Sequence, residues 1–116
     1  MFMGMQTLPV VYVDNNTIET LENVTITFDG DNAKEPTFKK IKSGERVSTA
    51  LYNKVDGKKT VYMKYYNKKL RITERQEIFE GLDQSPLGTM GTILVEVQNK
   101  KNDGRYEINI VKNFTL

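Results

Sequence analysis

Polar and apolar residues alternate with a period of two along much of this 116-residue chain. In residues 23–28, for example, apolar side chains fall on one face and threonines on the other. Successive side chains of a β-strand point to opposite faces, so this pattern predicts strands with one buried face. The clearest runs are residues 8–13, 23–28, 46–52, 59–66, 91–97 and 106–110.

Two turn motifs predict how some of these strands pair. Asp56-Gly57 and Asn102-Asp103-Gly104 each separate two alternating runs, and both sequences tolerate the positive φ of a tight turn. We therefore expect one hairpin over residues 46–66 and a second over residues 91–110. Pro36 is expected to keep the stretch that follows it irregular.

The segment from residue 73 to residue 82 has two interpretations. Thr73-Glu74-Arg75-Gln76 has the spacing of a helix capping box, and Gly81 is placed to end a short helix. Such a helix would be barely two turns long, with predicted strands on both sides. We therefore favour an extended conformation for residues 74–81.

Six to eight short strands without a long helical pattern predict an all-β fold. We expect an antiparallel β-sandwich that is immunoglobulin-like in the broad sense, although the Trp and Cys of true immunoglobulin domains are absent. A small barrel of the oligonucleotide-binding type is the alternative. The length predicts a single domain over residues 1–116, with residues 1–7 disordered or left over from cloning. The expected core comprises Val24, Ile26, Phe28, Val61, Met63, Ile93, Val95, Ile108 and Ile110.

The chain contains no histidine and no cysteine. It therefore lacks the usual general base at neutral pH and the thiolate nucleophile or metal ligand. The acidic run Asp29-Gly30-Asp31-Asn32 lacks the ligand spacing of a calcium-binding loop. Glu74, Glu77, Glu80 and Asp83 interleave with Arg75 like a solvated surface. We expect no catalytic residue, no cofactor and no metal site, and hence not an enzyme.

Seventeen basic residues face fifteen acidic ones, a net charge of +2 that by itself indicates no particular partner. The lysine clusters Lys39-Lys40-Lys42, Lys58-Lys59 and Lys100-Lys101 lie near predicted turns and strand ends. Lysines there protect sheet edges from aggregation. The same clusters would form a site for a polyanion only if the fold brought them together.

The strongest binding candidate is one face of the strand at residues 59–66 and the segment after it. Aromatic and basic side chains alternate there, and such a face can stack bases or sugar rings while neutralising acidic groups. Packing of the aromatic rings on the sheet explains the same pattern without a ligand. The candidate ligand face consists of Tyr62, Lys64, Tyr66, Lys68, Lys69 and Arg71.

Together these features predict a non-catalytic module with a binding or assembly role, whose partner is a protein that contacts a sheet edge or face. Weak binding of single-stranded nucleic acid or an acidic glycan through the aromatic and basic face is the alternative. No signal peptide or membrane span is recognisable in the chain. We expect a soluble protein, either cytoplasmic or exported with its leader removed. The sequence selects neither an oligomeric state nor a particular partner.

Overall fold

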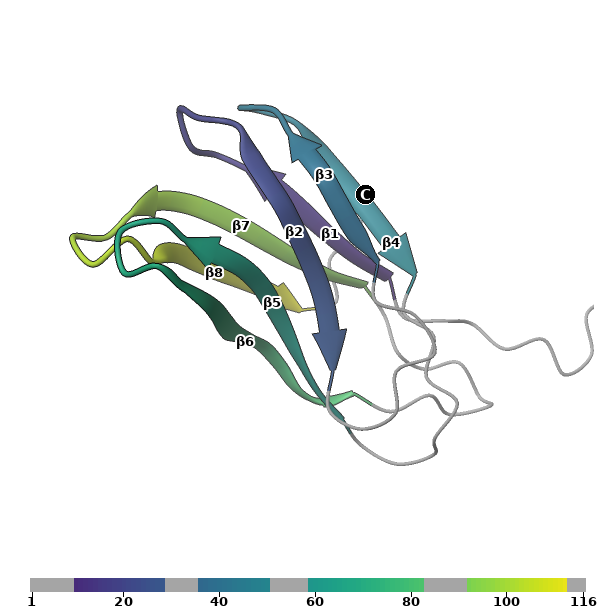
Figure 1. Ribbon diagram of the computed structural model, residues 1–116. Coiled ribbons are helices and arrows are strands. Elements are labelled where there is room, and N and C mark those ends of the chain that lie inside the picture. The colour runs from purple at the N-terminus through teal and green to yellow at the C-terminus, as the bar shows by residue number, and fades with distance from the viewer. Residues whose placement is uncertain (1–9, 29–35, 51–58, 83–91, 113–116) are drawn as a thin grey trace, which may run out of the picture.

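The computed structural model describes residues 10–28, 36–50, 59–82 and 92–112, which form eight strands. No helix occurs in these four ranges, so none there is long and apolar enough to cross a membrane. Two four-stranded sheets form the two layers of a β-sandwich (Figure 1). The strands are β1 (Val10–Asn15), β2 (Leu21–Phe28), β3 (Thr37–Ile41), β4 (Arg46–Ala50), β5 (Lys59–Asn67), β6 (Ile72–Leu82), β7 (Thr92–Lys100) and β8 (Tyr106–Lys112).

One sheet has the strand order β4-β1-β7-β8, and the other has the order β3-β2-β5-β6. All described strand pairs are antiparallel except β1 and β7, which are parallel. The predicted sandwich is therefore confirmed. The alternative of a small closed barrel is wrong, because the described strands form two separate sheets.

The predicted hairpin over residues 46–66 is wrong. β4 pairs with β1 in one sheet, whereas β5 lies between β2 and β6 in the other. Asp56-Gly57 lies outside the described residues. The alternation on each strand was recognised correctly, but a period of two shows which side chains are buried and does not select the neighbouring strand.

The other predicted hairpin is confirmed, since β7 and β8 pair antiparallel around residues 101–105. The extended interpretation of residues 74–81 is also confirmed, because they lie within β6. The expectation after Pro36 is wrong, since β3 begins at Thr37. Pro36 precedes the first residue of the strand, where its missing N–H is tolerated, and its carbonyl oxygen accepts a bond of 3.0 Å from Ile26 N.

The core lies between the two sheets. Six of the predicted core residues, Val24, Ile26, Val61, Met63, Ile93 and Val95, are at most 2% exposed. Ile108 and Ile110 are partly buried and pack against them. The side chain of Phe28 lies outside the described part of the structure. β1 and β3 add further buried side chains, including Val11, Val13 and Ile41.

The four described connections lie together at one end of the sandwich (Figure 1). The β1–β2 and β3–β4 connections pass from one sheet to the other. The β5–β6 turn (residues 68–71) and the β7–β8 turn (residues 101–105) each join neighbours within a sheet. Segments that are distant in the sequence therefore meet at this end.

Candidate functional site

A groove of about 680 Å³ opens at the end of the sandwich that carries these connections. The start of β2 and the end of β5 come from one sheet, and the β7–β8 turn comes from the other. The shape of the groove therefore depends on how the two sheets are held together at this end of the sandwich. Among the described residues, this end groove is lined by residues 19–24, 65–69, 100–102, 104 and 106.

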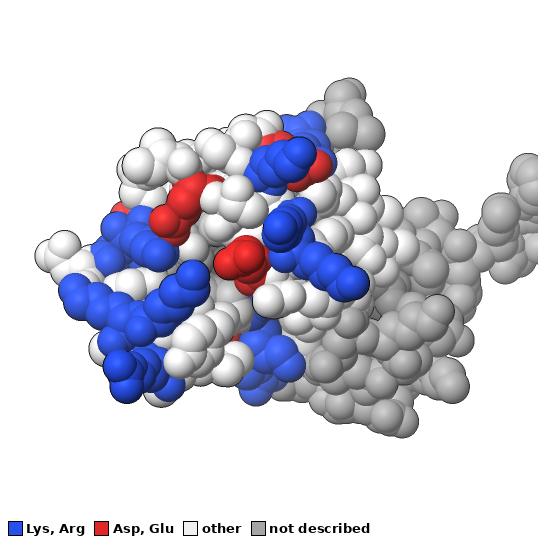
Figure 2. All heavy atoms as spheres, turned by 45° about the horizontal axis from the view of Figure 1, so that its top comes forward, with Lys and Arg blue, Asp and Glu red and all other residues white. Residues whose placement is uncertain are grey.

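Lysines from two different turns converge on the end groove. Lys68 and Lys69 follow β5, and Lys100 and Lys101 lie at the end of β7. Figure 2 shows basic side chains gathered at this end of the molecule, with acidic groups between them. Four lysines and two glutamates line the described part of the groove, so its charge is positive overall.

The first of these glutamates, Glu19, is held by two neighbours. Lys100 Nζ lies 2.9 Å from Glu19 Oε1, and the hydroxyl of Tyr106 donates to the same oxygen at 3.2 Å. The hydrogen bond from Lys100 is the main reason that the pKa of Glu19 is lowered. Lys100 is consequently neutralised in part by the protein itself.

The second glutamate, Glu22, is in looser contact with its lysine. Lys68 Nζ lies 4.0 Å from Glu22 Oε1, and both side chains are more than half exposed. Such an exposed pair contributes little to stability. Lys69 Nζ already donates to the carbonyl oxygen of Asn102, so Lys68 and the exposed Lys101 are the groove lysines best placed to meet a ligand.

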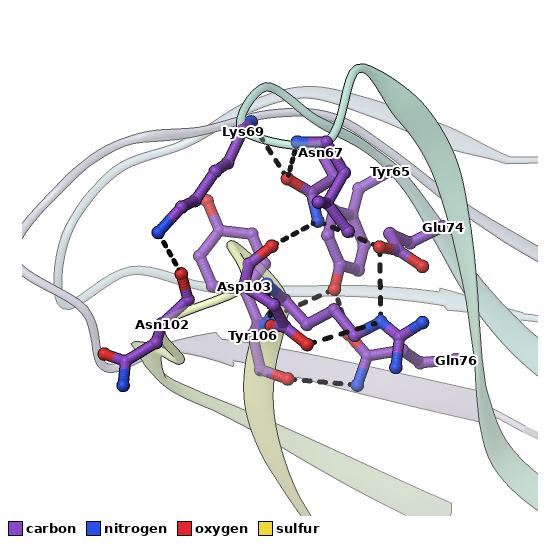
Figure 3. Close-up of polar contacts among 10 residues, drawn as sticks. Tyr65, Asn67, Lys69, Glu74, Gln76, Asn102, Asp103 and Tyr106 are labelled. Atoms are coloured by element: carbon purple, nitrogen blue, oxygen red, sulfur yellow. Dashed lines mark hydrogen bonds and ion pairs between the residues drawn. The ribbon is translucent and has the colours of Figure 1, made fainter.

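A buried asparagine, Asn67, fixes the wall of the groove between the two turns (Figure 3). Its Oδ1 accepts hydrogen bonds from the backbone N–H groups of Lys69 and Leu70, at 3.0 and 3.1 Å. Its Nδ2 donates to Glu74 Oε2 at 2.9 Å and to the carbonyl oxygen of Asp103 at 3.0 Å. All four hydrogen-bonding positions of the amide are thus used.

The hydrogen-bonded group around Asn67 also includes a buried carboxylate that forms an ion pair. Glu74 on β6 is 8% exposed, and its Oε2 accepts a bond of 3.3 Å from Nε of Arg105. This bond joins β6 of one sheet to the β7–β8 turn of the other. The Glu74 carboxylate raises the pKa of Arg105, mainly through the hydrogen bond, so the guanidinium remains charged.

Two tyrosines connect the sheets beside Asn67. The backbone N–H of Tyr106 donates to the hydroxyl of Tyr65 at 3.0 Å, and Gln76 Nε2 donates to the carbonyl oxygen of Tyr106 at 3.0 Å. The hydroxyl of Tyr65 also hydrogen-bonds Gln76 Oε1. The rings lie 5.0 Å apart with a tilt of 59°. Burial raises the pKa of both hydroxyls, so both tyrosines stay neutral.

Gly104 allows the β7–β8 turn to approach Asn67. Its φ of 88° is in the left-handed region, which favours glycine. A Cβ there would overlap the Oδ1 of Asn67 and lie 2.9 Å from the Cβ of Lys69. The glycine is thus needed both for the turn and for the close contact between the two turns.

The structure divides the predicted ligand face into two groups. Tyr62 and Lys64 lie on the outer face of their sheet, away from the end groove. The guanidinium of Arg75 lies 4.0 Å from the ring centroid of Tyr62, so this ring already has a cationic partner within the protein. Of the two aromatic residues on the predicted ligand face, Tyr62 is thus engaged within the sheet.

The other predicted residues lie closer to the groove. Tyr66, Lys68 and Lys69 line it, and the Tyr66 side chain is 55% exposed. Arg71 is exposed in the β5–β6 turn with a φ of 58°, but it does not line the groove. Of the predicted ligand face, therefore, only Tyr66, Lys68 and Lys69 line the groove.

Of the three lysine clusters, only Lys100-Lys101 lines the described part of the groove. Lys100-Lys101 joins Lys68 and Lys69, whereas Lys39 and Lys40 lie on β3 and do not line the groove. The side chains of Lys58 and Lys59 lie outside the described part of the structure.

Sequence reasoning missed Asn67 and Glu19. A signal for Asn67 was present, because it continues the inward alternation of Val61, Met63 and Tyr65. A polar residue at such a position indicates a buried hydrogen-bonding role. Nothing local distinguishes Glu19 from other surface glutamates.

The other candidates give no site in the described residues. The acidic run at residues 29–32 lies outside them. On β6, Glu74 is buried and pairs in register with Tyr65, while Glu77 is exposed and pairs with Tyr62. These two carboxylates therefore face opposite sides of the sheet. Across the described ranges no three acidic side chains gather in a way that would hold a metal ion.

Comparisons with known proteins show a similarity of fold. No protein-family model matches the chain, and no curated protein matches it. A solved structure of a protein from Eubacterium rectale, determined by NMR, matches with a TM-score of 0.52 and 16% identity. The alignment covers 97% of this chain and 95% of the other. At this identity the similarity concerns the fold alone.

Proposed function

We propose that this chain is a non-catalytic binding module whose ligand site is the end groove, and that its ligand is anionic. The observation that carries this proposal is the convergence of lysines from two turns on one groove. Clefts lined mostly by one sign of charge concentrate ligands of the opposite sign. Histidine and cysteine are absent from the chain, which favours binding over catalysis.

The rigidity of the groove wall supports the same proposal. Asn67 and the Tyr65–Tyr106 contact join the two turns through partly buried hydrogen bonds, and Gly104 allows the turns to approach closely. Lysines on turns held in this way lose less freedom on binding than lysines on a mobile loop. Preorganisation of this kind improves affinity without adding contacts.

A protein partner that contacts a sheet edge remains the other prediction from the sequence. The described edge strands are β3, β4, β6 and β8. No feature of these edges selects one of them over the others, whereas the groove has a defined shape and charge. We therefore assign the binding role to the groove.

The test is a titration with a fluorescent heparin hexasaccharide, used as a strongly anionic probe. Affinity should fall roughly tenfold when salt rises from about 50 to about 200 mM, as expected for about two ionic contacts. The double variant Lys68→Ser/Lys101→Ser should bind several-fold more weakly than the parent protein.

The matched control is Lys39→Ser/Lys112→Ser, which changes the net charge equally. Both of these lysines are exposed, and neither lines the groove. The control should retain most of the affinity. Equal losses in the two double variants, or binding that does not respond to salt, would contradict the proposal.

A further inference from the structure

We infer that the anionic ligand of the end groove is an acidic oligosaccharide, a chain of sugars that bears both acid groups and free hydroxyls. This inference rests on the proposed function and names the class of ligand. It is carried by the mixture of polar groups in the groove, which differs from that of a purely basic surface.

The first observation is that carboxylates stand beside the lysines. Glu19 and Glu22 both line the groove, and each side chain is about half exposed, at 46% and 52%. An ionised carboxylate accepts hydrogen bonds and donates none. Such a carboxylate repels any anionic group of a ligand but accepts strong hydrogen bonds from hydroxyl groups. A ligand that fits this groove supplies hydroxyl donors as well as negative charge.

The second observation concerns two asparagine amides on the groove lining. Asn23 and Asn102 both line the groove and are exposed. Within the described part of the chain, their side-chain amides form no hydrogen bond. An amide both donates and accepts, and two adjacent sugar hydroxyls present the complementary pair.

The third observation is that one aromatic ring is exposed among the described residues of the groove. Tyr66 lines the groove and is 55% exposed. The other tyrosines of the groove, Tyr65 and Tyr106, are held against each other by the bonds described above. Proteins that bind single-stranded nucleic acid stack successive bases on several rings. One ring beside amides and carboxylates suits the flat, apolar side of one sugar ring better than a run of bases.

These features assign roles across the groove. Lys68 and Lys101 bind the acid groups of the sugar chain. Glu22, with the amides of Asn23 and Asn102, binds its hydroxyls, and Tyr66 packs against a ring. A small number of oriented polar groups around an apolar contact is the usual composition of a specific ligand site.

The experiment compares three probes by NMR titration of the whole chain: a hexamer of galacturonic acid, a neutral maltohexaose and a single-stranded oligonucleotide of equal charge. The uronate should bind at least several-fold more tightly than either of the others. Its amide shifts should cluster on the groove residues and on neither Tyr62 nor Lys64.

The decisive variant is Glu22→Ala, because its effect has opposite signs for the two kinds of ligand. For a polyanion recognised by charge alone, removing this carboxylate removes repulsion and strengthens binding. For a sugar whose hydroxyls it accepts, the same change weakens binding several-fold. The matched control is Glu45→Ala in the β3–β4 connection, an exposed glutamate that does not line the groove.

The outcomes separate this inference from the proposed function. Uronate binding that weakens in Glu22→Ala and persists in Glu45→Ala supports the inference. An oligonucleotide that binds as tightly as the uronate, with both strengthened by Glu22→Ala, overturns the inference and leaves an anion-binding groove. The proposed function fails instead if no anionic probe loses affinity in Lys68→Ser/Lys101→Ser.

Discussion

Asn15 and Asn67 occupy matching positions, because each is the last residue of a strand and each has a buried, fully hydrogen-bonded side chain. Asn15 ends β1 in one sheet and is 0% exposed, while Asn67 ends β5 in the other and is 1% exposed. In each residue Nδ2 donates twice and Oδ1 accepts twice.

Both asparagines also join the two sheets. Asn15 Nδ2 donates to the carbonyl oxygen of Ile41, at the end of β3, at 2.7 Å, and its Oδ1 accepts from Thr17 N at 2.9 Å. Asn67 makes the equivalent bond to Asp103 O. Where the chain leaves a strand beside the core, its backbone N–H and C=O groups need hydrogen-bond partners. An asparagine at the strand end pairs them, which no apolar residue can do.

The first prediction concerns the stability contributed by Asn67. Asn67→Ala removes the partners of two backbone N–H groups and one carbonyl, and we expect a loss of about 3 kcal/mol. Asn15→Ala should cost a similar amount. Urea unfolding measures both.

Asn109→Ala is the control. The exposed Asn109 donates to Glu96, at 2.7 Å, and the loss of stability in this variant should stay under about 0.5 kcal/mol. Similar losses in all three variants would refute a special role for the buried pair.

The second prediction separates backbone strain from close contact. Gly44 and Gly104 both have positive φ, 81° and 88°, but a Cβ at Gly44 would meet no atom within 4 Å. Gly44→Ala should therefore cost about 1 kcal/mol from strain alone. Gly104→Ala should cost roughly 2 to 4 kcal/mol, because its Cβ also overlaps Asn67.

A double variant tests the cause of that difference. In Asn67→Ala/Gly104→Ala the overlapping amide oxygen is gone, so the combined loss should be smaller than the sum of the single losses. Strictly additive losses would show that the contact between the two turns is not the source of the cost.

The third prediction concerns alkaline pH. The pKa of Tyr65 and of Tyr106 is raised in the folded protein, mainly by burial. The unfolded chain therefore loses these protons first as pH rises. The stability they contribute is complete below about pH 10 and declines as pH rises above it. Urea unfolding from pH 8 to pH 11.5 should show this decline, and it should be smaller in Tyr106→Phe. A free energy of unfolding that stayed constant over this range would contradict the assignment.

The fourth prediction concerns Glu19. Its pKa is lowered, chiefly by the hydrogen bond from Lys100, so the stabilisation is present above the ordinary value of about 4.3 and is lost as pH falls through the folded value. Lys100→Gln should raise the pKa of Glu19 toward that ordinary value, as measured by NMR titration of its carboxyl carbon. Lys101→Gln, also in the groove, should leave it nearly unchanged. The reverse order of effects would show that Lys100 is not its partner.

The positions of most strands follow from local pattern. The alternation around Val24, Ile26, Val61 and Met63 places these side chains on buried faces, and the structure buries all four. This works because the two faces of a strand are set by the backbone itself. β3 was missed because its five residues carry two successive lysines and follow Pro36.

The candidate site was predicted only in part. Tyr66, Lys68 and Lys69 were identified because they lie close together in the sequence, at the end of one strand and directly after it. Lys101 was recognised only as a member of a charged cluster, because its distance from Lys68 in the sequence conceals their convergence. Tyr62 was placed in the site although Arg75 covers its ring, a contact that arises across two paired strands.

The sequence by itself determined that this chain is an all-β protein, which side chains face its core and where its C-terminal hairpin turns. The tertiary structure alone decided that β4 pairs with β1, that β1 and β7 run parallel and that two lysine-bearing turns share one groove. The reason is physical: a side chain's face depends on its own strand, whereas the choice of neighbour depends on how all the buried faces and backbone hydrogen bonds are satisfied together.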